Sequence, residues 1–291
     1  MRVLVLGGSG QLGSEIRRLW TSHAIDAPSH DELDVRTTAG VETAVDRFRP
    51  DALVNCAAFH NVDRCEETPE PAFEVNALAV ERLARVCARR GVHFATISTD
   101  YVFSGSATEP YVETDCARPI SAYGASKLAG ELLVEAVRSD ALIVRTCGVY
   151  GVRPSSSKGY TFVDRIVGKT RAGERSRVVR DVFASPTFAG DLAAALEFLI
   201  ERRAGGIYHA ADVGPVSWYD FAREAVRRAG LDPEAVEPIA SGEWSSGARR
   251  PQFSALDSGK LRAFGFSMPT WQEGLSAYLR LSRLSESAPS P

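Results

Sequence analysis

Tyr123 and Lys127 are the residues of this sequence whose types and spacing point most directly to chemistry. They stand four residues apart in SAYGASKLAG (121–130), a segment that is typical of the start of a helix. This spacing places both side chains on one helical face, about one turn apart. A lysine ammonium beside a phenol stabilises phenolate and lowers the pKa of the tyrosine, which prepares it for proton transfer. The alternative is that the two residues merely share a solvated face, and their spacing alone does not distinguish a catalytic pair from a surface pair.

A glycine-rich turn near the amino terminus indicates a second property, the binding of a dinucleotide. LVLGGSGQLGSEI carries Gly7, Gly10 and Gly13 in a GxxGxxG arrangement between an expected strand and an expected helix. Such glycines permit a tight turn and let a pyrophosphate approach the backbone amides at the helix start. A turn that is merely tight is the alternative. We predict that Gly7, Gly10, Gln11, Leu12 and Gly13 bind a cofactor.

Both motifs need a scaffold, and the hydrophobic pattern predicts one. The expected strands are 2–8, 24–28, 50–58, 93–99, 141–151 and 206–212, and the expected helices are 11–20, 41–48, 73–91, 121–138, 190–203 and 217–230. Strands that alternate with helices favour βαβ units and an α/β fold, a Rossmann-type doubly wound parallel sheet. Ligands of such sheets bind at the carboxyl ends of the strands, where both motifs should therefore meet.

The character of the chain changes after Gly151, which suggests two domains. We predict a dinucleotide-binding domain over residues 1–150, to which helix 190–203 returns, and a smaller, interleaved substrate-binding region over 151–284. The polar segment 152–159 is predicted to be a loop or an element that orders on binding. The tail 285–291 is predicted to be disordered.

Composition excludes several classes of function. The chain has 291 residues, a net charge of −3 and 44% hydrophobic residues, which is ordinary for a globular protein. No basic stretch is long enough for a nucleic-acid partner, and no apolar run reaches the ~18 residues of a membrane span. The five cysteines include no CxxC pair. We therefore expect a reduced cytoplasmic protein with no metal site of the zinc-knuckle kind.

Six blocks of the sequence occur in the order of a known enzyme family. They are NCAAFHNVDRCEETPEPAFEVNA (55–77), STDYVFSG (98–105), YGASKLAGE (123–131), RTCGVYG (145–151), SPTFAGDLA (185–193) and RPQFSALDSGKL (250–261). With the glycine turn they resemble the extended short-chain dehydrogenase/reductase superfamily and, most closely, its dTDP-4-dehydrorhamnose reductase family, over about residues 1–280. The resemblance implies NAD(P)H-dependent reduction of the C4 ketone of a nucleotide-linked 4-keto-6-deoxysugar.

The resemblance also implies roles for individual residues near the reacting ketone. Tyr123 would donate a proton to the sugar C4 oxygen, and Lys127 would lower the tyrosine pKa and hold the nicotinamide ribose. Thr99 takes the position of the superfamily residue that binds the reacting carbonyl, and Asp100 lies next to the sugar. The family's dehydratases resemble Thr-Asp-Glu here, whereas this chain has Tyr101 in the third position. The missing glutamate favours simple reduction over elimination.

Further positions follow from the same resemblance. Ala57, Ala58 and Phe59 would pass under the cofactor after the third strand. Asn76 would support the site, although a lone helical asparagine is more often structural. Arg250 suits the substrate diphosphate, with an ordinary surface arginine as the alternative.

One position departs from the family pattern. Gly148 stands where the family usually has a tryptophan that lies against the sugar. The resemblance therefore implies an altered, opened sugar pocket and leaves room for a deoxysugar other than the rhamnose precursor.

The choice of cofactor stays open between NADPH and NADH. Ser29 and His30 follow the second expected strand and can donate hydrogen bonds to a 2′-phosphate, which favours NADPH, whereas Asp31 opposes it if it points inward. Asp34 and Val35 would close over the adenine, unless Asp34 caps the next helix. A Mg²⁺ requirement and the oligomeric state, with a homodimer as one assembly, are also left open.

A rival function comes from another class. A non-catalytic, cofactor-binding regulatory subunit that resembles the methionine adenosyltransferase beta subunit would share the fold. The presence of Thr99, Tyr123 and Lys127 favours the enzyme.

Overall fold

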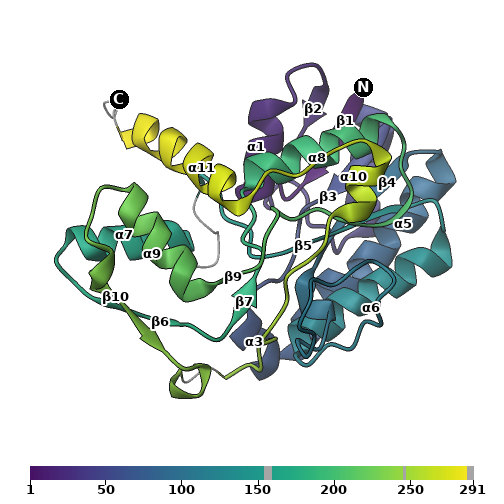
Figure 1. Cartoon of the computed structure of the whole chain (residues 1–291). Helices are drawn as coiled ribbons and strands as arrows, with labels where there is room; N and C mark the ends of the chain where they lie inside the picture. The colour runs from purple at the N-terminus through teal and green to yellow at the C-terminus, as the bar shows by residue number, and fades with distance from the viewer. Residues whose placement is uncertain (154–158, 245–246, 287–291) are drawn as a thin grey trace.

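The computed structural model describes residues 1–153, 159–244 and 247–286, and its centre is a six-stranded sheet (Figure 1). The strands are β1 (Arg2–Leu6), β2 (Ala24–Asp26), β3 (Ala52–Asn55), β4 (His93–Thr99), β5 (Leu142–Thr146) and β8 (Gly206–His209). Their order is β2-β1-β3-β4-β5-β8, and every neighbouring pair is parallel. The predicted fold class is thereby confirmed. The winding direction reverses between β1 and β3, which is where such sheets bind ligands.

Helices cover both faces of this sheet because successive strand residues point to opposite sides. Val3 and Val5 pack with α1 (Gln11–Leu19) and α8 (Ala189–Glu201). Leu4 and Leu6 pack on the other face with α2 (Thr38–Phe48), α5 (Ala79–Arg90) and the single buried valine of α6 (Ala122–Val137), Val134. Helix α8 thus belongs to the core of the sheet although it follows β5 by more than forty residues.

The helix expected over 73–91 is more complex than its sequence pattern suggests. The chain forms α3 (Val62–Glu67), α4 (Pro69–Phe73) and a π-helical turn, η1 (Glu74–Leu78), before α5 begins. Single π turns inside helices often occur at functional sites. Here the turn packs against α6, where a Cβ on Gly130 would lie 2.2 Å from the Asn76 carbonyl oxygen.

A second, less regular region lies beside the sheet (Figure 1). It contains α7 (Phe162–Arg171), α9 (Trp218–Arg228), α11 (Trp271–Glu286) and the strands β6 (Ser176–Val179), β7 (Phe183–Ala184), β9 (Val216–Ser217) and β10 (Val236–Ile239). Strand β10 pairs with β6 and β9 pairs with β7. Ser217 caps α9 as expected. The other elements were not predicted, and the four strands among them are too short to show a measurable alternation.

Smaller elements and boundaries complete the description. They are the 3₁₀ turns η2 (Asp100–Val102), η3 (Pro233–Ala235) and η4 (Ser241–Glu243), and α10 (Gly259–Phe264). Helix α11 continues to Glu286, and the rest of the predicted tail lies outside the described residues, as does most of the 152–159 segment. The domain division near residue 150 stays a prediction. No helix in the described ranges is long and apolar enough to cross a membrane.

Candidate active site

The glycine turn is fixed by close approaches between backbone atoms. Gly7 has a φ of 76°, and its carbonyl accepts a hydrogen bond from Gly10 N–H at 3.0 Å. A Cβ on Gly7 would lie 2.7 Å from the Ala57 nitrogen, and one on Gly13 would lie 2.4 Å from the Gly7 oxygen. Gly10 caps α1 without a side-chain hydrogen bond, and the first turn of α1 holds no acidic residue. The turn therefore presents helix amides that suit a pyrophosphate.

The loop after β3 lies directly against this turn at Ala57, and the contact of Ala57, Ala58 and Phe59 with a cofactor stays a prediction. Asn55 Oδ1 accepts a hydrogen bond from Ala57 N–H at 3.2 Å. Asn76 holds Phe59 through both of its backbone groups, at 2.9 Å each, and donates to Ser126 Oγ at 3.0 Å. The structure therefore gives Asn76 a supporting role, because it ties the loop under the glycine turn to the helix that carries Tyr123.

Tyr123, Lys127 and Thr99 meet at the carboxyl end of β4. Ser121 caps α6 by accepting from Gly124 N–H, so both Tyr123 and Lys127 lie in the first two turns of that helix. Gly124 lets α6 approach η2, since a Cβ there would lie 2.1 Å from the Tyr101 carbonyl oxygen. Lys127 is buried and its Nζ donates to the Ile97 carbonyl at 2.6 Å. A solvated surface pair is therefore excluded for Lys127.

The expected lowering of the Tyr123 pKa is not found. Burial raises the pKa of Tyr123 well above its ordinary value, and only a hydrogen bond with the Thr99 side chain opposes this effect appreciably. Burial also lowers the pKa of Lys127 to about 8, against the attraction of Glu131. The reason for the difference is that the lysine ammonium is bonded to a backbone carbonyl of β4 and is itself partly destabilised by burial.

Asp100 is more enclosed than a residue that lies next to a sugar would need to be. It is 3% exposed, and burial raises its pKa. Its carboxylate accepts a hydrogen bond from Thr99 Oγ1 at 2.9 Å and from Cys147 Sγ at 3.2 Å. Asp100 therefore orients the Thr99 hydroxyl. The contribution of Cys147 was missed in the sequence, because a lone cysteine gives no local signal.

Arg250 lies within reach of the catalytic residues. Its Nη1 donates to the Tyr101 hydroxyl at 3.3 Å, and the Tyr101 and Tyr123 rings stand edge to face with centroids 5.6 Å apart. Its Nη2 donates to Asp63 Oδ2 of α3 at 2.9 Å. Arg250 is thus partly buried and bonded on two sides, while its role toward the substrate stays a prediction. Of its two partners, Asp63 was not singled out from the sequence, and Tyr101 was considered only as the residue in place of a glutamate.

Gly148 does not face the open space that the sequence suggested. It has a φ of 54°, and a Cβ placed on it would lie 3.1 Å from Cη2 of Trp218 and 3.3 Å from the Pro186 Cα. Trp218 is the first residue of α9, and its ring also packs edge to face on Phe162. The expectation of an opened pocket wall is therefore wrong, because an indole from the second region stands beside this position.

The loop after β2 carries an acidic group next to the two residues expected to bind a 2′-phosphate. Ser29 and His30 are exposed, but Ser29 N–H donates to Glu32 Oε2 at 2.7 Å, an acidic group that the sequence analysis did not consider. Asp34 pairs with the Arg36 guanidinium, which lowers the pKa of Asp34 to about 2. Its side chain does not cap α2, whose N-cap is Thr37.

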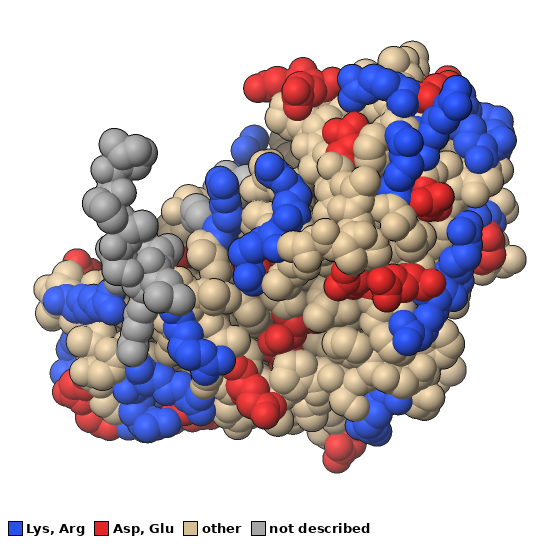
Figure 2. All heavy atoms as spheres, turned by 90° about the horizontal axis from the view of Figure 1, so that it is seen from above, with Lys and Arg blue, Asp and Glu red and all other residues tan. Residues whose placement is uncertain are grey.

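Val35 is half-buried against the core of the sheet. Basic and acidic residues occur together over the face seen in Figure 2, in keeping with the small net charge.

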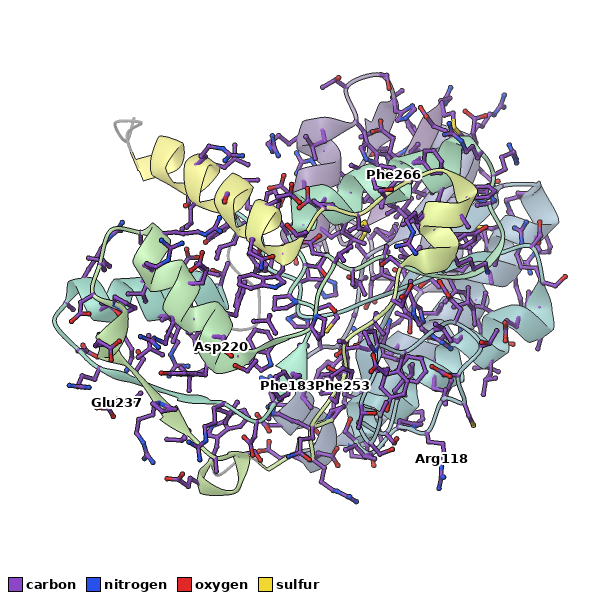
Figure 3. All side chains as sticks on the ribbon, in the orientation of Figure 1. Arg118, Phe183, Asp220, Glu237, Phe253 and Phe266 are labelled. Atoms are coloured by element: carbon purple, nitrogen blue, oxygen red, sulfur yellow. The ribbon has the colours of Figure 1, made fainter. Side chains whose placement is uncertain are left out.

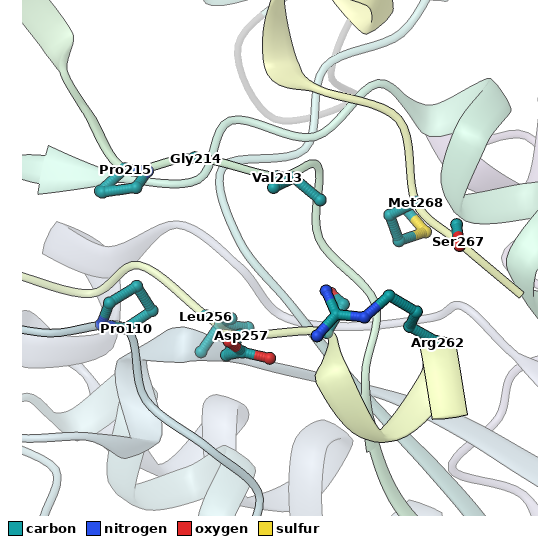
Figure 4. A pocket seen from close by; sticks show the side chains of 10 residues that line it. Pro110, Val213, Gly214, Pro215, Leu256, Asp257, Arg262, Ser267 and Met268 are labelled. Carbon is teal, nitrogen blue, oxygen red and sulfur yellow. The ribbon is translucent and has the colours of Figure 1, made fainter. Parts of the chain in front are cut away.

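Two other features lie outside this site. A cavity of about 160 Å³ follows β8 and is lined in part by Val213, Asp257 and Arg262 (Figure 4), and none of the predicted catalytic residues lines it. Among the described residues, one group has metal-ligand spacing, namely His23, Glu197 and Glu201. His23 precedes β2, so this group lies at the amino ends of the strands, away from Tyr123. The Mg²⁺ requirement stays open.

Comparison with known proteins places this geometry in a family. The family model described as the RmlD substrate binding domain matches residues 1–283. A dTDP-4-keto-6-deoxy-D-glucose reductase of Streptomyces niveus is 34% identical over 290 residues, 98% of this chain and 99% of that protein. A dTDP-4-dehydrorhamnose reductase of Burkholderia thailandensis is 36% identical over 298 residues, 96% and 98% of the two chains.

A solved structure extends the match to three dimensions. The crystal structure of a dTDP-4-dehydrorhamnose reductase of Bacillus anthracis in complex with NADP has a TM-score of 0.91 at 33% identity. The match covers 96% of this chain and 99% of that one. The resemblance seen in the ordered sequence blocks is thereby confirmed, and the chain belongs to the RmlD substrate-binding domain family.

Proposed function

We propose that this chain catalyses the NAD(P)H-dependent reduction of the C4 ketone of a nucleotide-linked 4-keto-6-deoxysugar. The observation that carries the proposal is the placement of Tyr123 at the start of α6, next to Thr99 at the end of β4 and one helical turn from buried Lys127. The Streptomyces niveus and Burkholderia thailandensis relatives, which are both reductases of dTDP-linked keto sugars, support the same reaction.

The residues around the glycine turn fit a nicotinamide dinucleotide. The N-terminus of α1 is uncapped by any side chain, and the contacts of Gly7 and Gly13 exclude a Cβ at the places where the turn approaches β3 and α1. Bound there, the nicotinamide supplies the hydride that reduces a ketone. The chain's own part is to hold the pyrophosphate at the helix amides and to present Tyr123 to the ketone oxygen.

Tyr123 is suited to give a proton rather than to take one. Because burial raises its pKa, the phenol stays protonated at neutral pH, which is the state that a proton donor needs. Thr99 lies beside both Tyr123 and Asp100, and its hydroxyl donates to the Asp100 carboxylate; we propose that this hydroxyl turns to the ketone oxygen when the sugar binds. Lys127 does not lower the pKa of Tyr123, so we propose that its ammonium supports the transfer by holding the nicotinamide ribose in place.

Tyr101 argues against dehydration as the alternative reaction. Elimination needs an acid or base in addition to Tyr123, and position 101 carries a phenol whose pKa burial raises to about 12. Its hydroxyl is turned toward Arg250. Reduction needs no further group than those present.

A panel of reduced-cofactor oxidation assays with TDP-, UDP- and GDP-linked 4-keto sugars tests the proposal. We expect oxidation of NADPH with at least one TDP-linked 4-keto-6-deoxysugar. Cofactor binding without turnover on the whole panel would instead favour the regulatory subunit, which the activities of the relatives do not favour. A homodimer, as a finer expectation, is tested by light scattering of the purified chain.

For the cofactor we propose NADPH, with the NADP complex of the Bacillus anthracis structure as support. Glu32 opposes this preference, because its carboxylate is bonded to Ser29 at the place expected for a 2′-phosphate. Glu32→Gln should therefore raise the ratio of kcat/KM for NADPH over NADH. Glu42→Gln serves as the matched control, because Glu42 is a half-buried acidic residue of α2 that pairs with Arg89. A strong NADH preference in both variants would contradict the proposal.

A further inference from the structure

Trp244 is a large aromatic residue left in solvent at the edge of the candidate site. It directly follows η4 and is 46% exposed. The guanidinium carbon of Arg250 lies 4.9 Å from the centroid of its ring. An exposed indole beside a cation is the arrangement on which planar heterocyclic bases stack. Packing in the protein core therefore does not explain why a tryptophan stands at this position.

A line of contacts leads from this indole to the proton donor. Outward from Tyr123 come the Tyr101 ring at 5.6 Å, then Arg250, which donates to the Tyr101 hydroxyl at 3.3 Å, and then Trp244. A nucleotide-linked sugar has the same order of parts, with the sugar at one end, the diphosphate in the middle and the base at the other end. The cation therefore stands where the negative charges of such a molecule would fall.

The segment that carries Arg250 is fixed in place on two sides. Asp63 accepts from Arg250 and, at 3.2 Å, from the Ala248 amide, which ties the segment to α3. Phe253 packs against Phe183 of β7, as Figure 3 shows, with ring centroids 6.2 Å apart. The guanidinium is thus held before any ligand arrives, which lowers the entropic cost of binding.

We propose that Trp244 is the stacking platform for the nucleobase of the substrate, with Arg250 binding the diphosphate between base and sugar. The inference rests on the proposed function, and it assigns the base and the diphosphate of that substrate to two different residues. Stacking involves the face of a base and not its hydrogen-bonding edges. Trp244 therefore contributes affinity for thymine and uracil alike and does not choose between them.

Calorimetric titration with dTDP, UDP and inorganic pyrophosphate tests the proposal without turnover. Trp244→Ala should weaken the binding of dTDP and UDP by about 5- to 150-fold, and Trp244→Phe should keep most of it. Pyrophosphate has no base, so its Kd should stay unchanged in Trp244→Ala. Arg250→Ala should weaken all three ligands, whereas its exposed neighbour Arg249→Ala is the matched control.

Three outcomes would overturn the inference. They are a native dTDP Kd in Trp244→Ala, an equal loss of pyrophosphate and dTDP, or an equal loss of NADPH affinity, which would indicate a general structural defect. A failure of the proposed function looks different, because the native chain would then reduce no 4-keto sugar whatever its affinity for dTDP.

Discussion

The two ends of the candidate site are built from different kinds of contact. At the cofactor end, a Cβ on Gly7 or Gly13 would collide with backbone atoms, at 2.7 Å and 2.4 Å. At the sugar end, a Cβ on Gly148 would lie at the longer distances of 3.1 Å from the Trp218 side chain and 3.3 Å from the Pro186 Cα. Backbone atoms cannot move without shifting a strand, whereas a side chain such as Trp218 can be exchanged for another. Gly7 and Gly13 therefore tolerate no larger residue, whereas position 148 is more open to change.

The largest expected effect is on kcat, and it should distinguish Tyr123 from Tyr101, whose rings are in contact between these two ends. Tyr123→Phe removes the proton donor and little surface, so kcat should fall by about 10²–10⁴-fold while the NADPH Kd stays near native. Tyr101→Phe is the matched control: its hydroxyl faces Arg250, so KM for the sugar should rise and kcat should be largely kept. Steady-state kinetics of both variants measure these changes. If Tyr123→Phe kept most of its kcat, Tyr123 would not be the proton donor.

Gly148→Trp tests the sugar end directly. The new side chain would have to adopt a φ of 54° and displace the Trp218 ring, which lies at contact distance. We expect kcat/KM for the native 4-keto sugar to fall by about 10- to 200-fold, with NADPH binding untouched. Gly148→Ala should show a smaller loss.

The opposite result for Gly148→Trp has a clear meaning. Better turnover of dTDP-4-keto-rhamnose, with no better substrate known, would show that the indole restores a missing wall. Trp218 would then have to move aside, and the loss of its packing on Phe162 would appear as a lower midpoint of urea unfolding.

The same contrast explains what the sequence could predict. The sheet, its covering helices and the glycine turn follow from periodicity and from positions that admit only glycine, so they are readable locally. The roles of Trp218 and Asp63 depend on which distant segments come into contact. No sequence pattern within α9 or α3 indicates those contacts. The pKa of Tyr123 was mispredicted for a related reason, since burial is a property of the assembled cleft and outweighs the lysine four residues away.

Gly13→Ala tests whether the cofactor end depends on backbone contact. The added methyl group meets the Gly7 oxygen and the Gly8 Cα, which is overpacking that costs about 1–3 kcal/mol in the free energy of unfolding. Gly168→Ala in α7 is the matched control, since nothing lies within 4 Å of its added Cβ, and it should stabilise by about 0.5–1 kcal/mol. Urea unfolding measures both changes, and equal midpoints for the two variants would refute the contrast.

The last expected effect is a pH dependence that links the two ends through Lys127 and is small near neutral pH. Its pKa of about 8 means that the ammonium loses its proton above that pH, so kcat should fall roughly tenfold per pH unit there. Tyr123 does not titrate in this range, because burial raises its pKa.

A loss of folded protein does not explain the expected fall in kcat either. Between pH 8 and the ordinary lysine value, the unfolded chain holds the proton that the folded chain has lost, so this residue's contribution to the free energy of unfolding rises with pH. Lys127→Met should abolish the inflection and lower kcat throughout, whereas Lys169→Met, which removes an exposed lysine of α7, should keep it. A native profile that stays flat to pH 10 would show that the charge of Lys127 plays no part in proton transfer.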